Sequence, residues 1–265
     1  MMKNSEKHMA GQEKFSEGEC GKLLYYQDPF YVKEAYRSAR TNLMFLPKKE
    51  GSECQIFVVT SANVCEGKSI NSSNLAIALS QNDKKVLLID CDMRKPKIAR
   101  LMHFPHTPGL SEYLAGMEKV PKIHECKRAD GLYVLTSGAT PPNPTELLSS
   151  PAMKHMLEEL SGKYDYILLD TPPVNMVADS LVLTELVTGY ILVVRANKTN
   201  QSDIDQALMR LQQVDAHVLG FLLNDVNPKP GAYNRYSHYG HGYGYGYGYG
   251  YGNKSESSGN VQKQA

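Results

Sequence analysis

Six short apolar runs, separated by segments of helical periodicity, constrain the fold of this 265-residue chain more than any other feature. The predicted strands are Ile56–Ser61, Val86–Asp90, Leu132–Thr136, Tyr164–Asp170, Ile191–Arg195 and Val218–Asn224. The predicted helices are 28–46 (beginning after Pro29), 68–82, 109–116, 145–162, 178–187 and 202–214. Apolar strands that alternate with helices favour an α/β fold with a doubly wound, mostly parallel sheet. In such sheets, ligands bind beyond the carboxyl ends of the strands.

The polar ends of the chain mark the limits of this domain. We expect one α/β domain over 28–226, between a flexible segment 1–27 and a disordered Tyr/Gly-rich tail 227–265. Glycine at every second tail position removes the side chains that a strand packs and adds backbone entropy. We find neither an apolar run of the roughly 18 residues that a membrane helix needs nor a secretory signal.

Charge and cysteine content narrow the class of protein. The 29 basic and 28 acidic residues leave no excess for a nucleic-acid or anionic-membrane surface. Five cysteines without C-x-x-C spacing suggest reduced thiols in a cytosol, not disulfides or a zinc site. We therefore expect a cytoplasmic protein that binds no nucleic acid.

The first predicted strand runs directly into a phosphate-binding loop. Ala62-x-x-x-x-Gly67-Lys68-Ser69 has P-loop spacing, with an amphipathic helix expected after it. Backbone N–H groups would cradle phosphate, Lys68 would approach the β/γ oxygens, and the Ser69 hydroxyl would bind Mg²⁺. The candidate nucleotide-binding residues of this loop are Ala62, Asn63, Val64, Cys65, Glu66, Gly67, Lys68, Ser69 and Ile70. The alternative is a helix N-terminus in which Gly-Lys-Ser occurs by chance.

Three acidic side chains follow or end two other predicted strands. Asp90 and Asp92 lie at the end of VLLIDCD, and Asp170 ends YDYILLD. An acid at the end of a buried apolar strand is unfavourable unless it meets a cation. Helix capping by these acids is the alternative. Their convergence on a sheet edge that carries a P-loop instead predicts Mg²⁺–ATP as the occupant.

Together these motifs are similar to those of a known family. The P-loop, the strand ending DCDMR at 90–94 and the strand ending DTP at 170–172 resemble the bacterial tyrosine kinases of capsule and exopolysaccharide synthesis, relatives of P-loop ATPases. The stretches GATPPNPTELL at 138–148 and EAYRSAR at 34–40 resemble a typical loop and the subunit-contact motif of that family. The resemblance covers the chain from about residue 30 to its end.

The resemblance assigns roles to individual residues. It implies that Asp90 is the catalytic base, and that Asp92 and Asp170 hold Mg²⁺ directly or through water. Arg94 would help to bind phosphate or would pair with an acid. Asn224, at the end of the last predicted strand, would hydrogen-bond adenine as in related ATPases.

The motif at 34–40 has two interpretations. Glu34, Arg37 and Arg40 recur every three residues and so share one broad helical face. By periodicity alone this is a solvated charged face, where each pair stabilises by about 0.2–0.5 kcal/mol. The resemblance instead implies the surface through which subunits join into homo-oligomeric rings.

The tail supplies an array of phenols outside any predicted core. A tyrosine hydroxyl, with a pKa near ~10, is a poor nucleophile at neutral pH unless a base lies beside it. The candidate phosphate acceptors, in trans within a ring, are Tyr233, Tyr236, Tyr239, Tyr243, Tyr245, Tyr247, Tyr249 and Tyr251. The alternative is an adhesive low-complexity segment without an acceptor role.

The resemblance also implies partners and a place in the cell. It suggests autophosphorylation, phosphorylation of other proteins, and control of polysaccharide synthesis and export. A membrane-embedded activator of the polysaccharide co-polymerase type would complete the site and recruit the chain to the inner face of the membrane, and a tyrosine phosphatase would reverse the reaction. The rival hypotheses are a partition or placement ATPase and a catalytically weak nucleotide-sensing scaffold.

The P-loop departs from the family pattern at two places. Val64-Cys65 stands where the family usually has Pro-Gly, and Ile70 replaces the usual threonine. Glycine takes positive φ freely, whereas cysteine adopts it with strain. We therefore expect weak activity, or a strong dependence on the activator.

Overall fold

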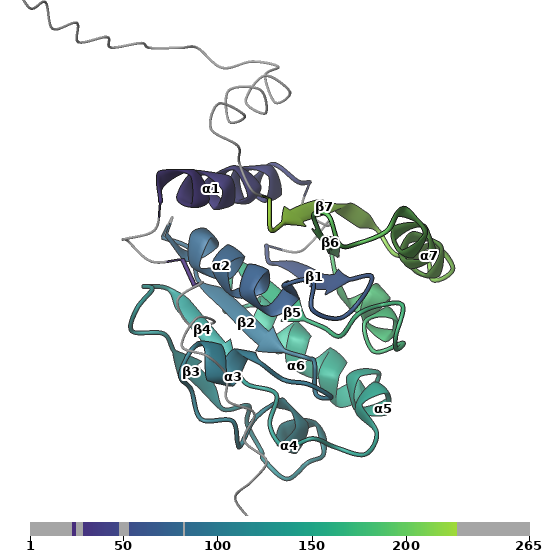
Figure 1. Ribbon diagram of the computed structural model, residues 1–265. Coiled ribbons are helices and arrows are strands. Elements are labelled where there is room, and N and C mark those ends of the chain that lie inside the picture. The colour runs from purple at the N-terminus through teal and green to yellow at the C-terminus, as the bar shows by residue number, and fades with distance from the viewer. Residues whose placement is uncertain (1–22, 25–28, 48–52, 82, 227–265) are drawn as a thin grey trace, which may run out of the picture. The chain divides into compact units, whose positions relative to one another are not determined.

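A computed structural model describes residues 23–24, 29–47, 53–81 and 83–226, all within the compact unit Met1–Val226 (Figure 1). These residues form a seven-stranded sheet of order β3-β4-β2-β5-β1-β6-β7, in which only β3 pairs antiparallel. The strands are β1 (Gln55–Ser61), β2 (Val86–Asp90), β3 (Ile123–Glu125), β4 (Leu132–Leu135), β5 (Tyr166–Asp170), β6 (Gly189–Arg195) and β7 (Val218–Asn224). The predicted fold class is therefore confirmed.

Helices cover both faces of the sheet. They are α1 (Phe30–Met44), α2 (Lys68–Ser80), α3 (Ile98–Leu101), α4 (Leu110–Leu114), α5 (Pro144–Leu148), α6 (Pro151–Ser161), the 3₁₀ helix η2 (Leu181–Leu186) and α7 (Gln201–Gln212). Buried side chains of α1, α2 and α3 join one core, and those of α4 to α7 join the other. No helix among the described residues is long and apolar enough to cross a membrane.

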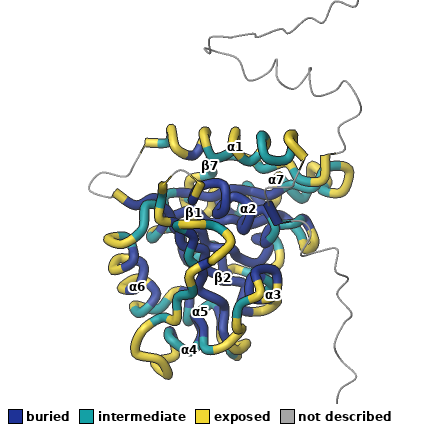
Figure 2. Tube along the Cα trace, turned by 90° about the vertical axis from the view of Figure 1, so that its left-hand side faces the viewer, coloured by how far each residue is buried: buried dark blue, intermediate teal, exposed yellow. Residues whose placement is uncertain are grey.

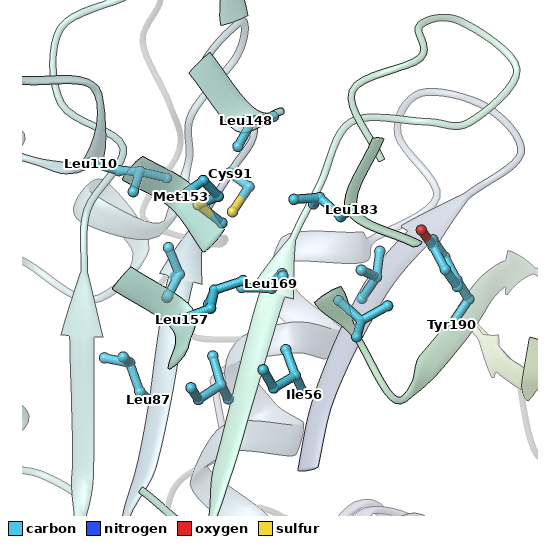
Figure 3. Close-up of a cluster of buried hydrophobic side chains, with 14 of the residues drawn as sticks. Ile56, Leu87, Cys91, Leu110, Leu148, Met153, Leu157, Leu169, Leu183 and Tyr190 are labelled. Carbon is cyan, nitrogen blue, oxygen red and sulfur yellow. The ribbon is translucent and has the colours of Figure 1, made fainter. Parts of the chain in front are cut away.

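Successive residues of a strand pack alternately into one core and the other. In β1, Ile56 and Val58 join the core beneath α4 to α7, whereas Phe57 and Val59 join the core beneath α1 and α2. The central strands lie in the buried interior (Figure 2), and Figure 3 shows part of the core beneath α4 to α7. A strand that packs on both faces has no polar side, which explains the continuous apolar runs of the sequence.

Two predicted helices differ in the structure. The segment 145–162 forms α5 and α6, because the Ser150 side chain accepts the Met153 N–H and Pro151 begins a new helix. The segment 178–187 contains the 3₁₀ helix η2 instead of an α-helix. The short edge strand β3 was not predicted, because three half-exposed residues carry too little periodicity.

Helix α2 is enclosed, although we expected an amphipathic helix. All of its residues except Ile70 are buried, including the polar Asn71 and Asn74. The cause is α1, which packs on its outer side (Figure 1). Within segment 1–27, Leu23 and Leu24 are buried in the same core. The rest of that segment, and the tail 227–265, lie outside the described residues.

Candidate nucleotide-binding site

The sheet order gathers three strand ends at one place. Strand β5 lies between β1 and β2, so the ends of all three strands are neighbours. Asp90 and Asp170 face one another in the β2–β5 register. The P-loop leaves the end of β1 and enters α2. The topology thus brings the predicted acids to the predicted phosphate-binding loop.

The backbone of the P-loop takes left-handed conformations at two residues. Gly67 has φ +92°, and a Cβ there would overlap the Asn224 amide nitrogen, so only glycine fits. Cys65 has φ +62° and is exposed. A non-glycine residue in this region is strained by about 1–2 kcal/mol. The strain predicted at Cys65 is therefore present in the structure.

The Glu66 side chain holds the P-loop from inside. It is buried, and its two carboxylate oxygens accept the Asn63 N–H at 3.1 Å and the Thr199 hydroxyl at 2.6 Å. The Asn224 amide donates to the Glu66 carbonyl oxygen at 2.9 Å. In this structure the Asn224 amide nitrogen therefore positions the loop. The resemblance had instead implied that the Asn224 side chain hydrogen-bonds adenine.

Two further side chains tie the loop to the β6–α7 region. Arg195 donates from Nη1 to the Cys65 carbonyl at 3.2 Å, and the Asn63 amide donates to Asp203 at 2.8 Å. Sequence reasoning missed Arg195, Thr199 and Asp203. Arg195 could have been found, because it ends a predicted strand and the carboxyl ends of parallel strands meet at one edge of the sheet.

Asp170 has an unpartnered oxygen in a buried position. Its Oδ1 accepts the Ser72 hydroxyl at 2.9 Å, whereas its Oδ2 is buried and has no hydrogen-bond partner among the described residues. Burial raises the pKa of Asp170 to about 6, although the Lys68 ammonium and the Ser69 hydroxyl act in the opposite direction. A buried carboxylate oxygen without a donor is a suitable ligand for a cation.

Lys68 and Asp92 lie together at the same edge. The Lys68 Nζ is 3.9 Å from Asp92 Oδ2, and both side chains are nearly buried. The other oxygen of Asp92 accepts the Lys95 N–H at 3.0 Å. Both charges are thus held in place at the P-loop.

The Asp90 carboxyl group is buried, whereas a catalytic base must contact the substrate hydroxyl. It is fully buried, and it accepts the N–H groups of Asp92, Lys97 and Ile98 at 3.0–3.2 Å. Burial, followed by the neighbouring Asp170 charge, raises the pKa of Asp90 well above its ordinary value. Because Asp90 is fully buried, contact with a tyrosine hydroxyl would require the residues that cover this carboxyl group to move.

The predicted magnesium ligands fit the ion by their chemistry. Ser69, Asp92 and Asp170 supply oxygen atoms, which Mg²⁺ prefers, and Asp170 Oδ2 lacks a partner. No three His, Cys, Asp or Glu side chains gather as a metal site among the described residues. Mg²⁺ usually takes one or two carboxylates and completes its shell with water and phosphate.

Arg94 pairs with a buried acid. Its Nε and Nη2 donate to the two oxygens of Asp179 at 2.8 and 3.0 Å. The Thr145 hydroxyl, from the family-typical loop, donates to the same carboxylate at 2.6 Å. Of the two interpretations of Arg94, this geometry favours the acid partner over a phosphate.

The three charged residues of α1 have different partners. Arg37 and Glu34 form an exposed pair at 3.4 Å, whereas the Arg40 guanidinium turns to α2 and donates to the Ala78 carbonyl at 3.0 Å. Glu34 and Arg37 therefore remain candidates for a subunit contact, and Arg40 has a role within the chain. The predicted acceptor tyrosines lie outside the described residues.

Comparison with known proteins identifies the family. A family model described as ParA, NUBPL iron-transfer P-loop NTPase, matches residues 53–242. Putative tyrosine-protein kinase CapB of Staphylococcus aureus is 36% identical over 209 residues, 79% of this chain and 90% of that protein. The chain belongs to the bacterial tyrosine-protein kinase family. The family member YwqD of Bacillus subtilis is 36% identical over 207 residues, 78% of this chain and 86% of its own length.

Solved structures of this kinase family have the same fold. The chimerical protein CapA2B2 gives a TM-score of 0.71 at 32% identity, over 78% of this chain and 90% of that one. The kinase domain of Escherichia coli ETK gives 0.70 at 35% identity, over 81% and 80%. The septum site-determining protein MinD from Pyrococcus horikoshii, at 24% identity and a TM-score of 0.54, shows a shared fold only.

Replacing Cys65 by glycine tests the P-loop strain. We expect Cys65→Gly to bind Mg²⁺–ADP about 3- to 10-fold more tightly, because glycine takes positive φ without the cysteine penalty of about 1–2 kcal/mol. Isothermal titration of both chains measures the change. Cys126→Gly, at a buried cysteine outside the loop, is the control and should leave the affinity unaltered. Equal affinities for Cys65→Gly and the unaltered chain would show that the strain does not affect binding.

Proposed function

We propose that this chain transfers the γ-phosphate of ATP to tyrosine hydroxyls, first of all those of its own tail. The observation that carries the proposal is the unpartnered Asp170 oxygen beside a P-loop lysine in a chain of the tyrosine kinase family. The P-loop NTPase fold implies nucleotide binding. Phosphoryl transfer needs mainly in-line positioning and cations at the phosphates.

The residues of the site would bind the phosphates, hold Mg²⁺ and accept the tyrosine proton. The N–H groups at the start of α2 and the Lys68 ammonium bind the phosphate oxygens. Ser69, Asp92 and Asp170 hold Mg²⁺, which neutralises charge on the phosphates when bound. Asp90, whose pKa is raised by burial, would accept the tyrosine proton once the carboxyl group is uncovered to the substrate hydroxyl.

The tail tyrosines are the proposed acceptors. Each added phosphate carries roughly −1.5 to −2 charges, so that a modified tail becomes strongly anionic. Repulsion between such tails would loosen an assembly of several chains. The acceptors remain the tyrosines named above, from Tyr233 to Tyr251.

Labelled ATP tests this function directly. Incubation of the full chain with Mg²⁺ and γ-labelled ATP should place label on tyrosine in the peptide 233–251, found by phosphopeptide mapping. A chain with all eight of these tyrosines replaced by phenylalanine is the control and should lose that label. Label that appears only as free phosphate would favour a placement ATPase. An unchanged protein mass, after co-expression with a phosphatase and addition of ATP, would favour a nucleotide-sensing scaffold.

We further propose that Glu34 and Arg37 form a ring contact between subunits. Both are exposed enough to reach another chain, and among the described residues they form only one weak pair, with each other. We expect Arg37→Ala to shift the oligomer to smaller species in analytical ultracentrifugation without lowering the melting temperature. Arg40→Ala should lower the melting temperature, because the Ala78 carbonyl loses a donor. A ring that survives Glu34→Ala and Arg37→Ala would exclude this contact.

The chain is also proposed to work at the membrane in polysaccharide synthesis and export. One similar protein of known structure is the chimerical protein CapA2B2. The longer relative etk of Escherichia coli matches this chain over only 26% of its own length. Both are consistent with a kinase domain that acts with a membrane-embedded activator. Cell fractionation should find the chain with membranes only when the activator is present. Polymer length should change in cells that carry Lys68→Met, and a tyrosine phosphatase should remove the tail phosphates.

A further inference from the structure

A series of hydrogen bonds runs from the segment before α1, through α1 and α2, to the P-loop. The Leu24 N–H donates to Asn74 Oδ1 at 2.6 Å, and the Asn74 amide donates to the Tyr36 hydroxyl at 3.1 Å. The Tyr36 hydroxyl donates to Asn71 Oδ1 at 2.8 Å, and the Asn71 amide donates to the Gly67 carbonyl at 2.9 Å. We call these four bonds the hydrogen-bond relay. It connects α2 and the P-loop to Tyr36, 35 residues before Asn71, and to Leu24, 50 residues before Asn74.

The hydrogen-bond relay has a single direction. Each asparagine accepts with its oxygen and donates with its nitrogen, and the Tyr36 hydroxyl accepts one bond and donates the next. Asn71 and Asn74 are 1% and 2% exposed, so water does not replace a missing partner easily. The hydroxyl of Tyr36 is therefore the link that orients both buried amides.

The relay ends on the peptide that begins the phosphate-binding helix. The Gly67 carbonyl accepts two N–H groups of Asn71, from the backbone at 3.0 Å and from the side chain at 2.9 Å. A trans peptide is planar, with its C=O and N–H pointing in opposite directions. Holding the Gly67 carbonyl therefore aims the Lys68 N–H away from α2, toward the loop. This N–H is among the unpaired donors of a helix start that bind phosphate.

We propose that Tyr36 is a positioning residue for phosphate binding: through Asn71, its hydroxyl fixes the Gly67–Lys68 peptide in the orientation that receives a nucleotide phosphate. Glycine at 67 makes this restraint necessary, because glycine has more conformational freedom than any other residue. The proposal rests on nucleotide binding at the P-loop. It also places a contribution to that site on α1, a helix outside the matched family model, which begins at residue 53.

Removing one oxygen atom tests the proposal. Tyr36→Phe keeps the ring, which packs against the core beneath α1, and removes only the hydroxyl. We expect the dissociation constant for Mg²⁺–ADP to rise about 5- to 20-fold, since both asparagines lose a partner and the peptide regains freedom. Fluorescence titration of the full chain with a labelled ADP measures it. The melting temperature without nucleotide is recorded alongside.

Tyr190→Phe is the matched control. The buried Tyr190 hydroxyl donates to the Ser180 carbonyl and contacts Thr184, both outside the P-loop. We expect this change to lower the melting temperature and to leave the dissociation constant within about twofold. A loss of affinity in both variants would overturn the proposal, because it would reflect general destabilisation.

A double-mutant cycle separates positioning from mere packing. In an Asn71→Ala chain the relay is already broken, so adding Tyr36→Phe should not weaken binding further. Asn71→Ser closes the same cycle if Asn71→Ala is too unstable to purify. Additive losses, or unaltered affinity in Tyr36→Phe, would overturn the positioning role while leaving nucleotide binding intact. A wild-type chain that does not bind Mg²⁺–ADP would instead refute the proposed function.

Discussion

A Lys68→Met chain is expected to keep its fold and to lose phosphate transfer to its tail by a factor of about 10² to 10³. The methionine is of similar length but carries no charge, so the phosphate oxygens lose the cation that the P-loop directs to them. Asp92 also loses its ion partner at 3.9 Å. Phosphopeptide mapping of the region 233–251, with labelled ATP and Mg²⁺, measures the loss.

Lys84→Met is the matched control for this experiment. Lys84 precedes β2, at the amino end of the sheet, and pairs with Asp165 at 2.9 Å on the surface. Such an exposed pair contributes at most about 1 kcal/mol, and it lies at the sheet edge opposite the P-loop. Lys84→Met should therefore retain full transfer. Comparable activity of Lys68→Met and Lys84→Met would refute the phosphate-binding role of Lys68.

Asp170→Asn is expected to have opposite effects on function and stability. Transfer should fall by about 10²-fold or more, because Mg²⁺ loses a ligand. In the absence of nucleotide, the variant should be more stable than the original chain at pH 8, by an amount of the order of 2 kcal/mol. The reason is that burial raises the pKa of Asp170 to about 6, so its charged form is unfavourable in the fold.

The pH dependence of this difference has a definite sign. The pKa of Asp170 is 3.8 as an ordinary side chain and about 6 in the folded chain, so between these values the folded state binds more protons than the unfolded state. Stability is therefore lost as the pH rises through that window. Asparagine has no such loss. Denaturant unfolding of both chains should show nearly equal stability at pH 4 and a growing advantage of Asp170→Asn up to pH 7.

Saturating Mg²⁺–ADP gives the complementary measurement. A cation beside Asp170 favours the charged carboxylate, so the nucleotide should stabilise the original chain strongly at pH 8 and Asp170→Asn much less. Ser72→Ala, which removes the hydroxyl bonded to Asp170 Oδ1, is a control that leaves Oδ2 untouched. Equal stabilisation of the original chain and Asp170→Asn would show that Asp170 does not hold the metal.

The proximity of the P-loop and the acidic side chains could be predicted from the sequence, for a topological reason. Gly67, Lys68, Asp90 and Asp170 stand at strand ends or helix starts, and a parallel sheet brings such ends to one edge. Their proximity thus follows from the alternation of strands and helices. No side-chain geometry had to be known.

Pairings between distant loops could not be predicted in this way. Arg94 and Asp179 are 85 residues apart, and their bond depends on how two loops fold over the sheet edge. The same holds for the partner of Arg40, which the three-residue spacing only placed on one broad helical face with Glu34 and Arg37. In the structure the Arg40 guanidinium donates to the Ala78 carbonyl of α2.

Strand β7 lies at the border of the sheet and, among the described strands, is hydrogen-bonded only to β6. It ends in Asn224, whose side-chain amide donates a hydrogen bond to the Glu66 carbonyl of the phosphate-binding loop. A border strand opens more readily than an interior one. The bond from Asn224 to the loop therefore lasts only as long as the ladder between β6 and β7, so opening of this border strand would remove one of the restraints on the phosphate-binding loop.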